Sequence, residues 1–315
     1  MLKGGILLVF IFVTEVLIMN NLPDFYRIKL LTKSSGHTEE QREYCFKNNL
    51  FAIGWPINDS VNSVEEYLEY AKNEYSQDTF NKLYYSYNNL NRMKINDFIW
   101  VQKDSRNYYL GQVDSEISYT DEHIHDIGLT RRCSKWKHID FDDVPGIVTS
   151  YYAGPGKVLE YCKSINESDD IKQYCVWLYN DKNYNIAITN GINLLHYEDL
   201  EDLMGLFLQF GYEGTKYYIH PSTNKLSTKA IEYELRNESG EKFGIQCKIG
   251  KSKVNEKTLR TLINNGYRIF VCTYGSEEYN NKSITKIPIN ELWDWAKKHE
   301  GLLPKRIKNY INISM

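Results

Sequence analysis

Two short strands near the C-terminal end of the chain carry the residues best suited to chemistry. In AIEYELRNESGEKFGIQCKIG, Glu232 and Glu234 alternate with apolar residues, and Gln246 and Lys248 do the same after the turn-rich NESGE. Side chains alternate between the two faces of a strand, so each pair shares one face. If the turn is centred near Ser239, the two polar faces coincide, and carboxylates, an amide and an ammonium group converge.

This combination suits the hydrolysis of phosphodiesters. Mg²⁺ prefers oxygen ligands such as carboxylates. The metal polarises the phosphate and lowers the pKa of the attacking water, while a nearby lysine stabilises the developing charge. The structural alternative is a cross-strand ion pair on a solvated sheet face. The hairpin alone does not separate these two interpretations.

The surroundings of the hairpin favour a polyanionic partner. From Lys216 to Arg268 the chain has 11 Lys and Arg against 5 Asp and Glu, although its net charge is -3. A local basic excess of this kind is typical of nucleic-acid binding. Lys251 and Lys253 follow the hairpin as candidate phosphate-binding residues. Upstream, HYEDLEDLMGLFLQFGY predicts a helix in which Glu201 is a further candidate ligand, although acidic first turns also suit the helix dipole.

These residues resemble the PD-(D/E)XK restriction-endonuclease superfamily, in its Mrr-like branch. The resemblance covers about residues 190–315. It is carried by Glu201 in LEDL, by the Tyr233-Glu234 strand, and by Gln246-Cys247-Lys248 as a QxK form of the (D/E)xK half-motif. It implies Mg²⁺-dependent DNA cleavage, with Glu201, Glu232, Glu234 and Gln246 as metal ligands and Lys248 beside them.

The sequence departs from the family pattern at two points. No Pro-Asp precedes the metal-ligand position, and Gln246 replaces the acid of the half-motif, which removes a negative charge from the site. QxK is an accepted variant in the Mrr-like branch, so we expect an active site. The motif favours Glu234 as the main ligand, whereas simple hairpin register pairs Glu232 with Gln246, and both remain candidates.

Aromatic residues recur in the N-terminal half of the chain. Trp55 lies in IGWP, Trp100 in DFIWVQ, Tyr109 in NYYLGQV and Trp136 in RRCSKWKHI. Such rings can stack on a flipped or unpaired base. The cations that could bind phosphates beside them are Arg131, Arg132 and Lys135. For any single ring, packing in the core is the more common role.

Taken in order, these segments resemble the EVE/PUA-like domains, relatives of the YTH fold. The resemblance covers roughly residues 24–160 and is carried by IGW, NDFIWVQ, YYLGQV, RRCSKW and VPGIV. It implies a pocket that recognises a modified base through an aromatic cage. Trp55 is the residue that the match supports most directly, followed by Trp100, Tyr109 and Trp136.

The predicted elements form two domains of an α+β/α/β chain. Residues 19–168 form a PUA-like small mixed barrel with helices, residues 169–189 a linker, and residues 190–315 an α/β sheet flanked by helices. Capping boxes predict helix starts at Thr38 and Ser63. Strands are expected at 26–32, 50–56, 97–102, 107–113, 147–152, 216–219 and 267–273, and helices at 38–48, 63–71, 78–90, 197–210, 255–265 and 288–298.

Composition limits the remaining choices. The chain is 42% hydrophobic and 25% charged, as expected for a globular protein, and its six cysteines include no CxxC pair. Scattered cysteines indicate reduced thiols and a cytoplasmic location. Residues 1–18 are apolar but short and contain Glu15, so we expect an extension outside the functional fold, with a weak membrane anchor as the alternative. No stable membrane association is expected.

Together these features predict a modification-dependent, type IV-like restriction endonuclease. The first domain recognises DNA carrying a modified base, and the second cuts it with Mg²⁺. The resemblance also allows a homodimer, because two strands need two cuts and one chain carries one candidate site. Two alternatives remain: a non-catalytic reader of modified nucleic acid, and a nuclease that acts on RNA.

Overall fold

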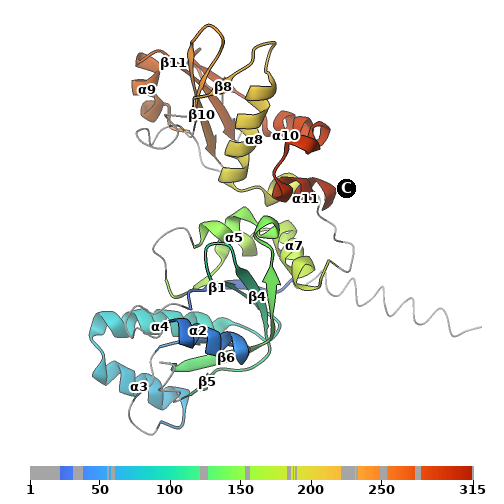
Figure 1. Cartoon of the computed structure of the whole chain (residues 1–315). Helices are drawn as coiled ribbons and strands as arrows, with labels where there is room; N and C mark the ends of the chain where they lie inside the picture. Colours follow the sequence, from blue (N-terminus) through green and yellow to red (C-terminus); the bar gives the residue numbers. More distant parts are fainter. Residues whose placement is uncertain are drawn as a thin grey trace, which may run out of the picture. The chain divides into compact units, whose positions relative to one another are not determined.

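The structure is a computed structural model of the whole chain. It describes residues 22–30, 38–54, 57, 61–120, 127–152, 157–182, 186, 188, 190–220, 231, 233–248, 254–273 and 278–313. The chain divides into two compact units, residues 1–188 (unit 1) and residues 189–315 (unit 2). Figure 1 shows the elements of each unit.

Unit 1 is built on a curled sheet that forms a half-barrel (Figure 1). Its strands follow the order β2-β6-β4-β3-β1-β7, with β5 on β6. β1 and β3 are parallel, and the other described pairs are antiparallel. The long β6 pairs with β2 through its first half and with β4 through its second half, which curls the sheet. The strands are β1 (Phe25–Ile28), β2 (Leu50–Ile53), β3 (Phe98–Gln102), β4 (Tyr108–Val113), β5 (Ser118–Tyr119), β6 (Leu129–Ile139) and β7 (Leu159–Tyr161).

Helices cover both faces of this sheet. The helices of unit 1 are α2 (Thr38–Lys47), α3 (Val64–Glu74), α4 (Gln77–Arg92), α5 (Gly146–Ser150), α6 (Lys163–Asn166) and α7 (Asp169–Tyr179), with a 3₁₀ turn η2 (Phe141–Asp143). α3 begins where the capping box predicts, since the Ser63 hydroxyl accepts from the backbone N–H of Glu66 at 3.1 Å. The main core joins α2, α3 and α4 to one sheet face, and α7 lies against the other.

Two predictions about the secondary structure and domain limits of unit 1 are wrong. The segment 147–152, expected as a strand, belongs to α5 and the turn after it, where the N–H of Val148 bonds to the carbonyl of Pro145. Residues 169–189, expected as a linker, begin with α7, and its Tyr174 and Cys175 are fully buried. The polar run NESDD caps this helix, because the Ser168 hydroxyl accepts from the N–H of Ile171 and two acids follow in the first turn.

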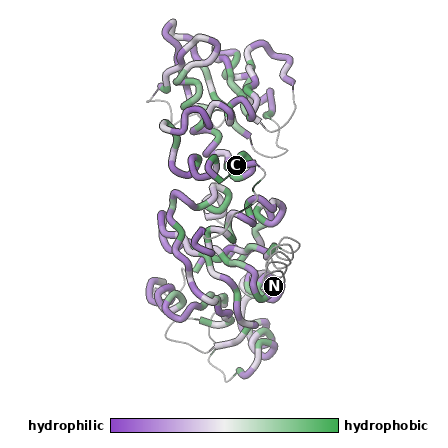
Figure 2. Tube along the Cα trace, turned by 90° about the vertical axis from the view of Figure 1, so that its right-hand side faces the viewer, coloured by the Kyte–Doolittle hydropathy of each residue, from purple (hydrophilic) through white to green (hydrophobic). Residues whose placement is uncertain are grey.

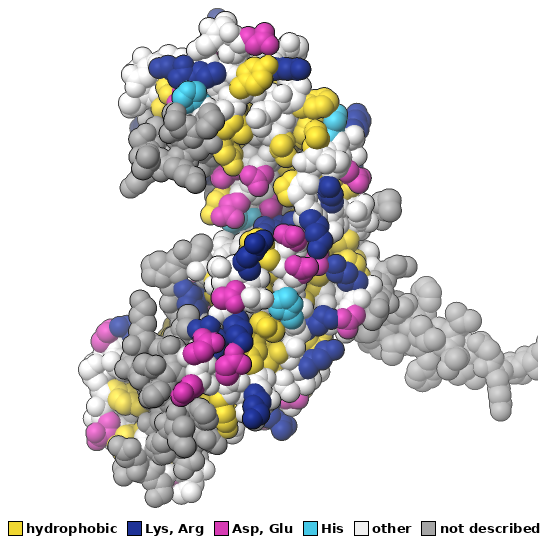
Figure 3. Space-filling model, viewed as in Figure 1, with side chains coloured by type: hydrophobic (Ala, Val, Ile, Leu, Met, Phe, Trp, Pro, Cys, Tyr) yellow, Lys and Arg dark blue, Asp and Glu magenta, His cyan; other side chains and the backbone are white. Residues whose placement is uncertain are grey.

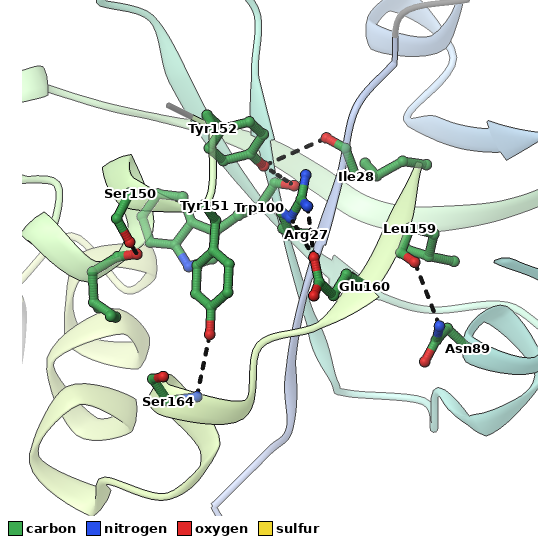
Figure 4. A network of polar contacts seen from close by, with 11 residues as sticks. Arg27, Ile28, Asn89, Trp100, Ser150, Tyr151, Tyr152, Leu159, Glu160 and Ser164 are labelled. Carbon is green, nitrogen blue, oxygen red and sulfur yellow. Dashed lines mark hydrogen bonds and ion pairs between the residues drawn. The ribbon is translucent and has the colours of Figure 1, made fainter. Parts of the chain in front are cut away.

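A buried arginine joins β1 to β7 and to the segment after α5 (Figure 4). The Arg27 Nη2 donates to Glu160 Oε2 at 2.6 Å, and its guanidinium carbon lies 6.0 and 5.7 Å from the ring centres of Tyr151 and Tyr152. The Tyr152 hydroxyl donates to the Trp100 carbonyl at 2.8 Å. These contacts hold β7, the last strand in the sheet order, to β1 and to the segment after α5.

Unit 2 contains a mixed five-stranded sheet in the order β12-β11-β10-β9-β8. β8, β9 and β10 form an antiparallel meander, whereas β10, β11 and β12 are parallel. The strands are β8 (Tyr218–Ile219), β9 (Glu234–Arg236), β10 (Lys242–Lys248), β11 (Tyr267–Thr273) and β12 (Ile284–Lys286). The helices are α8 (Tyr197–Phe210), α9 (Glu256–Asn264), α10 (Ile289–Lys298) and α11 (Lys305–Ile313), with the 3₁₀ turns η3 (Gly191–Leu194) and η4 (Glu300–Leu302).

α8 and α9 cover opposite faces of this sheet. Leu259 and Leu262 of α9 pack on Val271 and its apolar neighbours. On the other face α8 approaches closely, since a Cβ on Gly205 would lie 3.9 Å from the Tyr233 ring. Gly244 of β10 has no room for a side chain, because a Cβ there would lie 2.7 Å from Ile231 Cγ2. Apolar segments gather inside each unit (Figure 2), and both units are mixed α and β, as the sequence predicts.

Candidate functional site

The hairpin of unit 2 has the register that its sequence predicts. Glu234 pairs with Gly244 and Arg236 with Lys242, which centres the turn at Ser239. Gln246 and Lys248 therefore lie on the same face of the sheet as Glu234. Glu232 lies outside the described residues, as do Lys251 and Lys253.

Glu234 serves the hairpin itself. It is 7% exposed; its Oε1 accepts from Arg236 Nη2 at 2.5 Å and its Oε2 from the Tyr267 hydroxyl at 2.7 Å. Burial favours the neutral carboxyl, but the hydrogen bonds from Tyr267 and Arg236 outweigh it and hold the pKa of Glu234 below its usual value. Both carboxylate oxygens are thus bound by protein donors, which removes the support for Glu234 as the main metal ligand.

Gln246 and Lys248 lie at the carboxyl end of the central strand. Gln246 is 5% exposed and pairs with Val271 of β11. Its Nε2 donates to the Cys247 carbonyl at 3.4 Å. Lys248 is the last residue of β10, is half-buried, and pairs with Thr273. A polar pair thus follows the apolar middle of the strand, with Gln246 buried and Lys248 half-buried.

The acidic start of α8 lies at the same end of the sheet. Asp202 Oδ1 accepts from the Tyr233 hydroxyl at 3.1 Å, and the Tyr233 carbonyl accepts from the N–H of Ile245 at 3.1 Å. Burial raises the pKa of the Tyr233 hydroxyl, and the charges of Asp202 and Glu201 raise it further. Glu201 and Gln246 therefore lie at one end of the sheet but on its opposite faces, because α8 covers the Tyr233 face.

The described part of unit 2 does not complete a metal site. No three His, Cys, Asp or Glu side chains among the residues that the structure describes gather closely enough to hold a metal ion. Of the four predicted ligands, Glu201 and Gln246 are at the expected end of the sheet, Glu234 is bound elsewhere, and Glu232 is not described.

The structure separates the aromatic residues that were predicted to form one cage. Trp100 is fully buried and lies beside Cys175 of α7, on the sheet face away from the main core. Tyr109 and Trp136 both pack on Phe46 of α2, with ring centres at 4.5 and 5.4 Å. Trp55 lies outside the described residues. The cage prediction is therefore wrong for Trp100, and Tyr109 and Trp136 form a half-buried cluster with Phe46.

Arg131 is a structural residue and not a phosphate ligand. It is 1% exposed, and its guanidinium donates to the carbonyls of Leu90, Met93 and Ser115 at 2.8–2.9 Å. The last carbonyls of a helix lack partners within it, and Arg131 supplies donors to the end of α4. Burial lowers its pKa. Strand alternation turns Arg132 outward with 65% of its side chain exposed, and Lys135 is exposed 5.4 Å from the Tyr179 ring centre.

Unit 1 has a cavity that its sequence did not predict. It lies between α2, β2 and α4, next to the glycine of IGW. Its described lining includes Lys29, Gln41, Cys45, Gly54, Lys82 and Ser86, and none of Trp100, Tyr109 and Trp136. Burial raises the pKa of the Cys45 thiol to about 12, so this cysteine is an inert part of the wall. Gly54 of the IGW segment is the sequence feature that lies beside this cavity.

The described charged side chains of unit 1 are of mixed sign on the face seen in Figure 3. On the face seen in Figure 3, described Lys and Arg side chains alternate with Asp and Glu side chains over this unit. Within the described ranges, no helix has both the length and the apolar character needed to cross a bilayer. All six cysteines are buried free thiols.

Comparison with known proteins gives one match. A family model for a domain of unknown function (DUF8426) matches residues 28–143, which run from the end of β1 to η2 in unit 1. No curated protein and no solved structure matches the chain. The matched family carries no stated activity, so function rests on the residues.

Proposed function

We propose that unit 2 is a DNA endonuclease with a restriction-endonuclease-like fold, and that unit 1 is a PUA-like (EVE) module that recognises a modified base. The chain would then be a modification-dependent restriction enzyme. A nuclease with little specificity of its own needs a separate recognition module, because otherwise it would cleave unmodified host DNA. The two units supply these two roles in one chain.

One observation carries this proposal. The acidic first turns of α8 and the Gln246-Lys248 pair of β10 lie at the same end of the unit 2 sheet, joined through Tyr233. Acids, an amide and an ammonium group at the carboxyl ends of parallel strands occupy the usual ligand-binding edge of an open α/β sheet. That edge is where a phosphodiester would meet them.

Mg²⁺ is the cofactor that this donor chemistry favours, but the described residues alone do not fit it. Glu201 and Gln246 offer hard oxygen ligands. They lie on opposite faces of the sheet, and among the described residues no three His, Cys, Asp or Glu side chains gather to hold a metal ion. We propose Glu232, which simple hairpin register pairs with Gln246 and which lies outside the described residues, as a further ligand. When bound, the metal would polarise the phosphate and activate water.

The residues of the chain that act without the metal are Lys248 and Tyr233. The half-buried Lys248 ammonium stabilises the charge that develops on the phosphate during attack. Tyr233 holds Asp202 by its hydroxyl and β10 by its carbonyl, so it fixes the distance between α8 and the hairpin. In unit 1, the cavity beside Gly54 is the place where a base would enter.

A non-catalytic reader of modified nucleic acid is the second candidate. It is favoured by the absence of a three-acid cluster within the described residues and by the full engagement of Glu234. In that case the hairpin would be a binding surface. The two candidates differ in whether DNA is cut.

Digestion of a panel of phage DNAs with different base modifications tests the proposal. We expect the purified full chain to cut one or more of them only when Mg²⁺ is present, and to leave unmodified DNA intact. The Lys248→Ala variant is expected to bind the same DNA and to cut it at least 100-fold more slowly, the usual cost of losing a charge-stabilising donor.

The outcomes separate the candidates. Binding of modified DNA without cleavage under any condition supports the reader. Equal cleavage by wild type and Lys248→Ala would remove Lys248 from the site. Stronger binding and cutting of RNA than of DNA of the same sequence would make the substrate RNA.

A further inference from the structure

Aromatic rings gather at the carboxyl ends of α8 and α10. Phe210 ends α8 and is 52% exposed, and its ring centre lies 4.3 Å from that of His299. Trp295 of α10 stacks on His299 with the ring centres 4.7 Å apart, and both residues are half-buried. α8 has 14 residues, so this group lies about 20 Å from the acidic start of that helix. The aromatic group is therefore separate from the candidate nuclease site.

The outer side of α10 carries an acid near one end and a base near the other. Glu291, Trp295 and Lys298 follow the spacing i, i+4, i+7, which places them along one side of the helix. Glu291 and Lys298 are exposed, and Trp295 lies between them. The residues of α10 that are buried against the rest of unit 2 are Leu292, Trp293 and Ala296.

This row of three residues is complementary to itself when its direction is reversed. Glu291 and Lys298 are equally far along the helix from the midpoint between Asp294 and Trp295. In an antiparallel pair of α10 helices with a two-fold axis at that midpoint, Glu291 of each copy faces Lys298 of the other. The two Trp295 rings meet at the centre, as the self-complementary contact of a two-fold dimer requires.

The charges around the rings favour a protein partner over a nucleic acid. Glu291 and Asp294 are exposed on α10 beside Lys297 and Lys298, so a phosphate backbone would meet acids as well as bases. An apolar centre with a rim of mixed charge is typical of an interface between proteins. Glu291 and Lys298 also suit the dipole of their own helix, and an exchange of charge between two chains separates that role from an interface.

We propose that this surface joins two copies of the chain, with their α10 helices antiparallel and Trp295 at the centre. The interface then contains two Glu291–Lys298 pairs, one on either side of the aromatic rings. Phe210 adds apolar area next to them. The dimer brings two candidate nuclease sites into one particle, but the association itself does not depend on the function proposed for unit 2.

Sedimentation equilibrium of the purified full chain at micromolar concentrations tests this inference. We expect the wild type to dimerise, and Glu291→Lys and Lys298→Glu each to raise the dimer dissociation constant about tenfold or more, because two attractive pairs become repulsive. An equimolar mixture of the two variants should recover the dimer, since each pair across that interface again joins opposite charges. Lys297→Glu is the matched control, because Lys297 is exposed on α10 outside the row. It should leave the dissociation constant within about twofold of the wild-type value.

Phe210→Ser supplies a second test that does not involve charge. It should also raise the dissociation constant, because an exposed ring is lost from the interface. A wild type that stays monomeric overturns the inference, as does a dimer that neither charge variant weakens. If the wild type is monomeric and Phe210→Ser weakens its binding to a DNA duplex, the surface binds nucleic acid instead.

Cleavage is measured separately from self-association. A dimer that cuts no DNA in the phage panel leaves this inference standing and removes the proposed nuclease function. Cleavage by a chain that does not self-associate has the opposite meaning.

Discussion

Unit 1 and unit 2 use the charged residues of their strands in different ways. In unit 1, Arg131 and Arg27 are almost fully buried, and their guanidinium groups bind carbonyls of the chain or a carboxylate. In unit 2, Glu234 is bound in the same manner, whereas Lys248 lies half-buried at the end of β10.

The difference shows that a charged residue in a strand is not by itself evidence of a site. Its role depends on the groups that the fold places beside it. These are backbone groups without partners or side chains of opposite charge. The end of α4 needs donors, and Arg131 supplies them. At the carboxyl end of β10, Lys248 is half-buried, and β10 itself carries no acid (KFGIQCK).

The largest effect is expected at Arg131. Arg131→Met should lower the free energy of unfolding of unit 1 by about 3 kcal/mol, because carbonyls at the end of α4 lose their donors. Native-state hydrogen exchange of unit 1 amides measures the change. Arg132→Met, on the exposed face of the same strand, is the matched control and should change it by less than about 0.5 kcal/mol. A similar, small loss in both variants would contradict the structural role.

A smaller effect concerns the start of α8, where two buried groups oppose each other. Burial lowers the pKa of His196 to about 4, helped by Arg306, and burial raises the pKa of Asp199 to about 6 against the charge of Arg306. The stability from neutral His196 is present above pH 6.5 and is lost as the pH falls towards 4. The stability from Asp199 is present below about pH 4 and is lost as the pH rises through 6.

Because these contributions have opposite slopes, we expect them to cancel largely between pH 4 and 6.5. Asp199→Asn should make unit 2 less stable than wild type as the pH falls over this range, by an amount on the order of 2 kcal/mol. His196→Asn should have the reverse slope. Denaturant unfolding at several pH values, with hydrogen exchange to assign unit 2, measures both. Parallel pH profiles for the two variants would show that the groups do not oppose each other.

Substitution of Glu201 is expected to affect cleavage, whereas substitution of Glu234 is expected to affect stability. Glu234→Gln should destabilise unit 2 by about 1–2 kcal/mol, through weaker bonds to Arg236 and Tyr267, and leave cleavage nearly unchanged. The lowered pKa of Glu234 adds stability above its usual pKa that is lost on acidification, so wild type and variant should converge in acid. Glu201→Gln should instead slow cleavage with little loss of stability.

Cleavage assays and unfolding measurements on the same two proteins test this pair. If Glu234→Gln abolishes cleavage while unit 2 stays folded, Glu234 is the metal ligand after all.

The smallest effect is expected at Gly205 of α8. A Cβ there would lie 3.6 Å from Ile219 Cδ1, which is ordinary contact, and alanine favours a helix by up to about 1 kcal/mol over glycine. Gly205→Ala should therefore stabilise unit 2 by about 0.5–1 kcal/mol without moving α8. Gly244→Ala on β10 should destabilise it, because its Cβ would meet Ile231 Cγ2 at 2.7 Å. If Gly244→Ala also stabilised unit 2, Gly244 would have room for a side chain, contrary to the structure.

Local sequence signals predicted much of unit 2 and less of unit 1. The bounds of α8 and β11 and the turn centred at Ser239 agree with the periodicity and the turn residues. In unit 1, β6 was not predicted because its polar residues hide the alternation, and segment 147–152 was misassigned because β-branched residues favour a strand locally.

The sequence by itself determined which residues share a face and where the helices begin, since alternation, periodicity and capping act within a few residues. It therefore placed Gln246 with Lys248 and started α3 at Ser63. Only the tertiary structure decided that Arg131 holds α4 and that Tyr267 binds Glu234. Burial, and the partners that distant segments bring to a charge, depend on how the elements pack, and no local pattern contains that information.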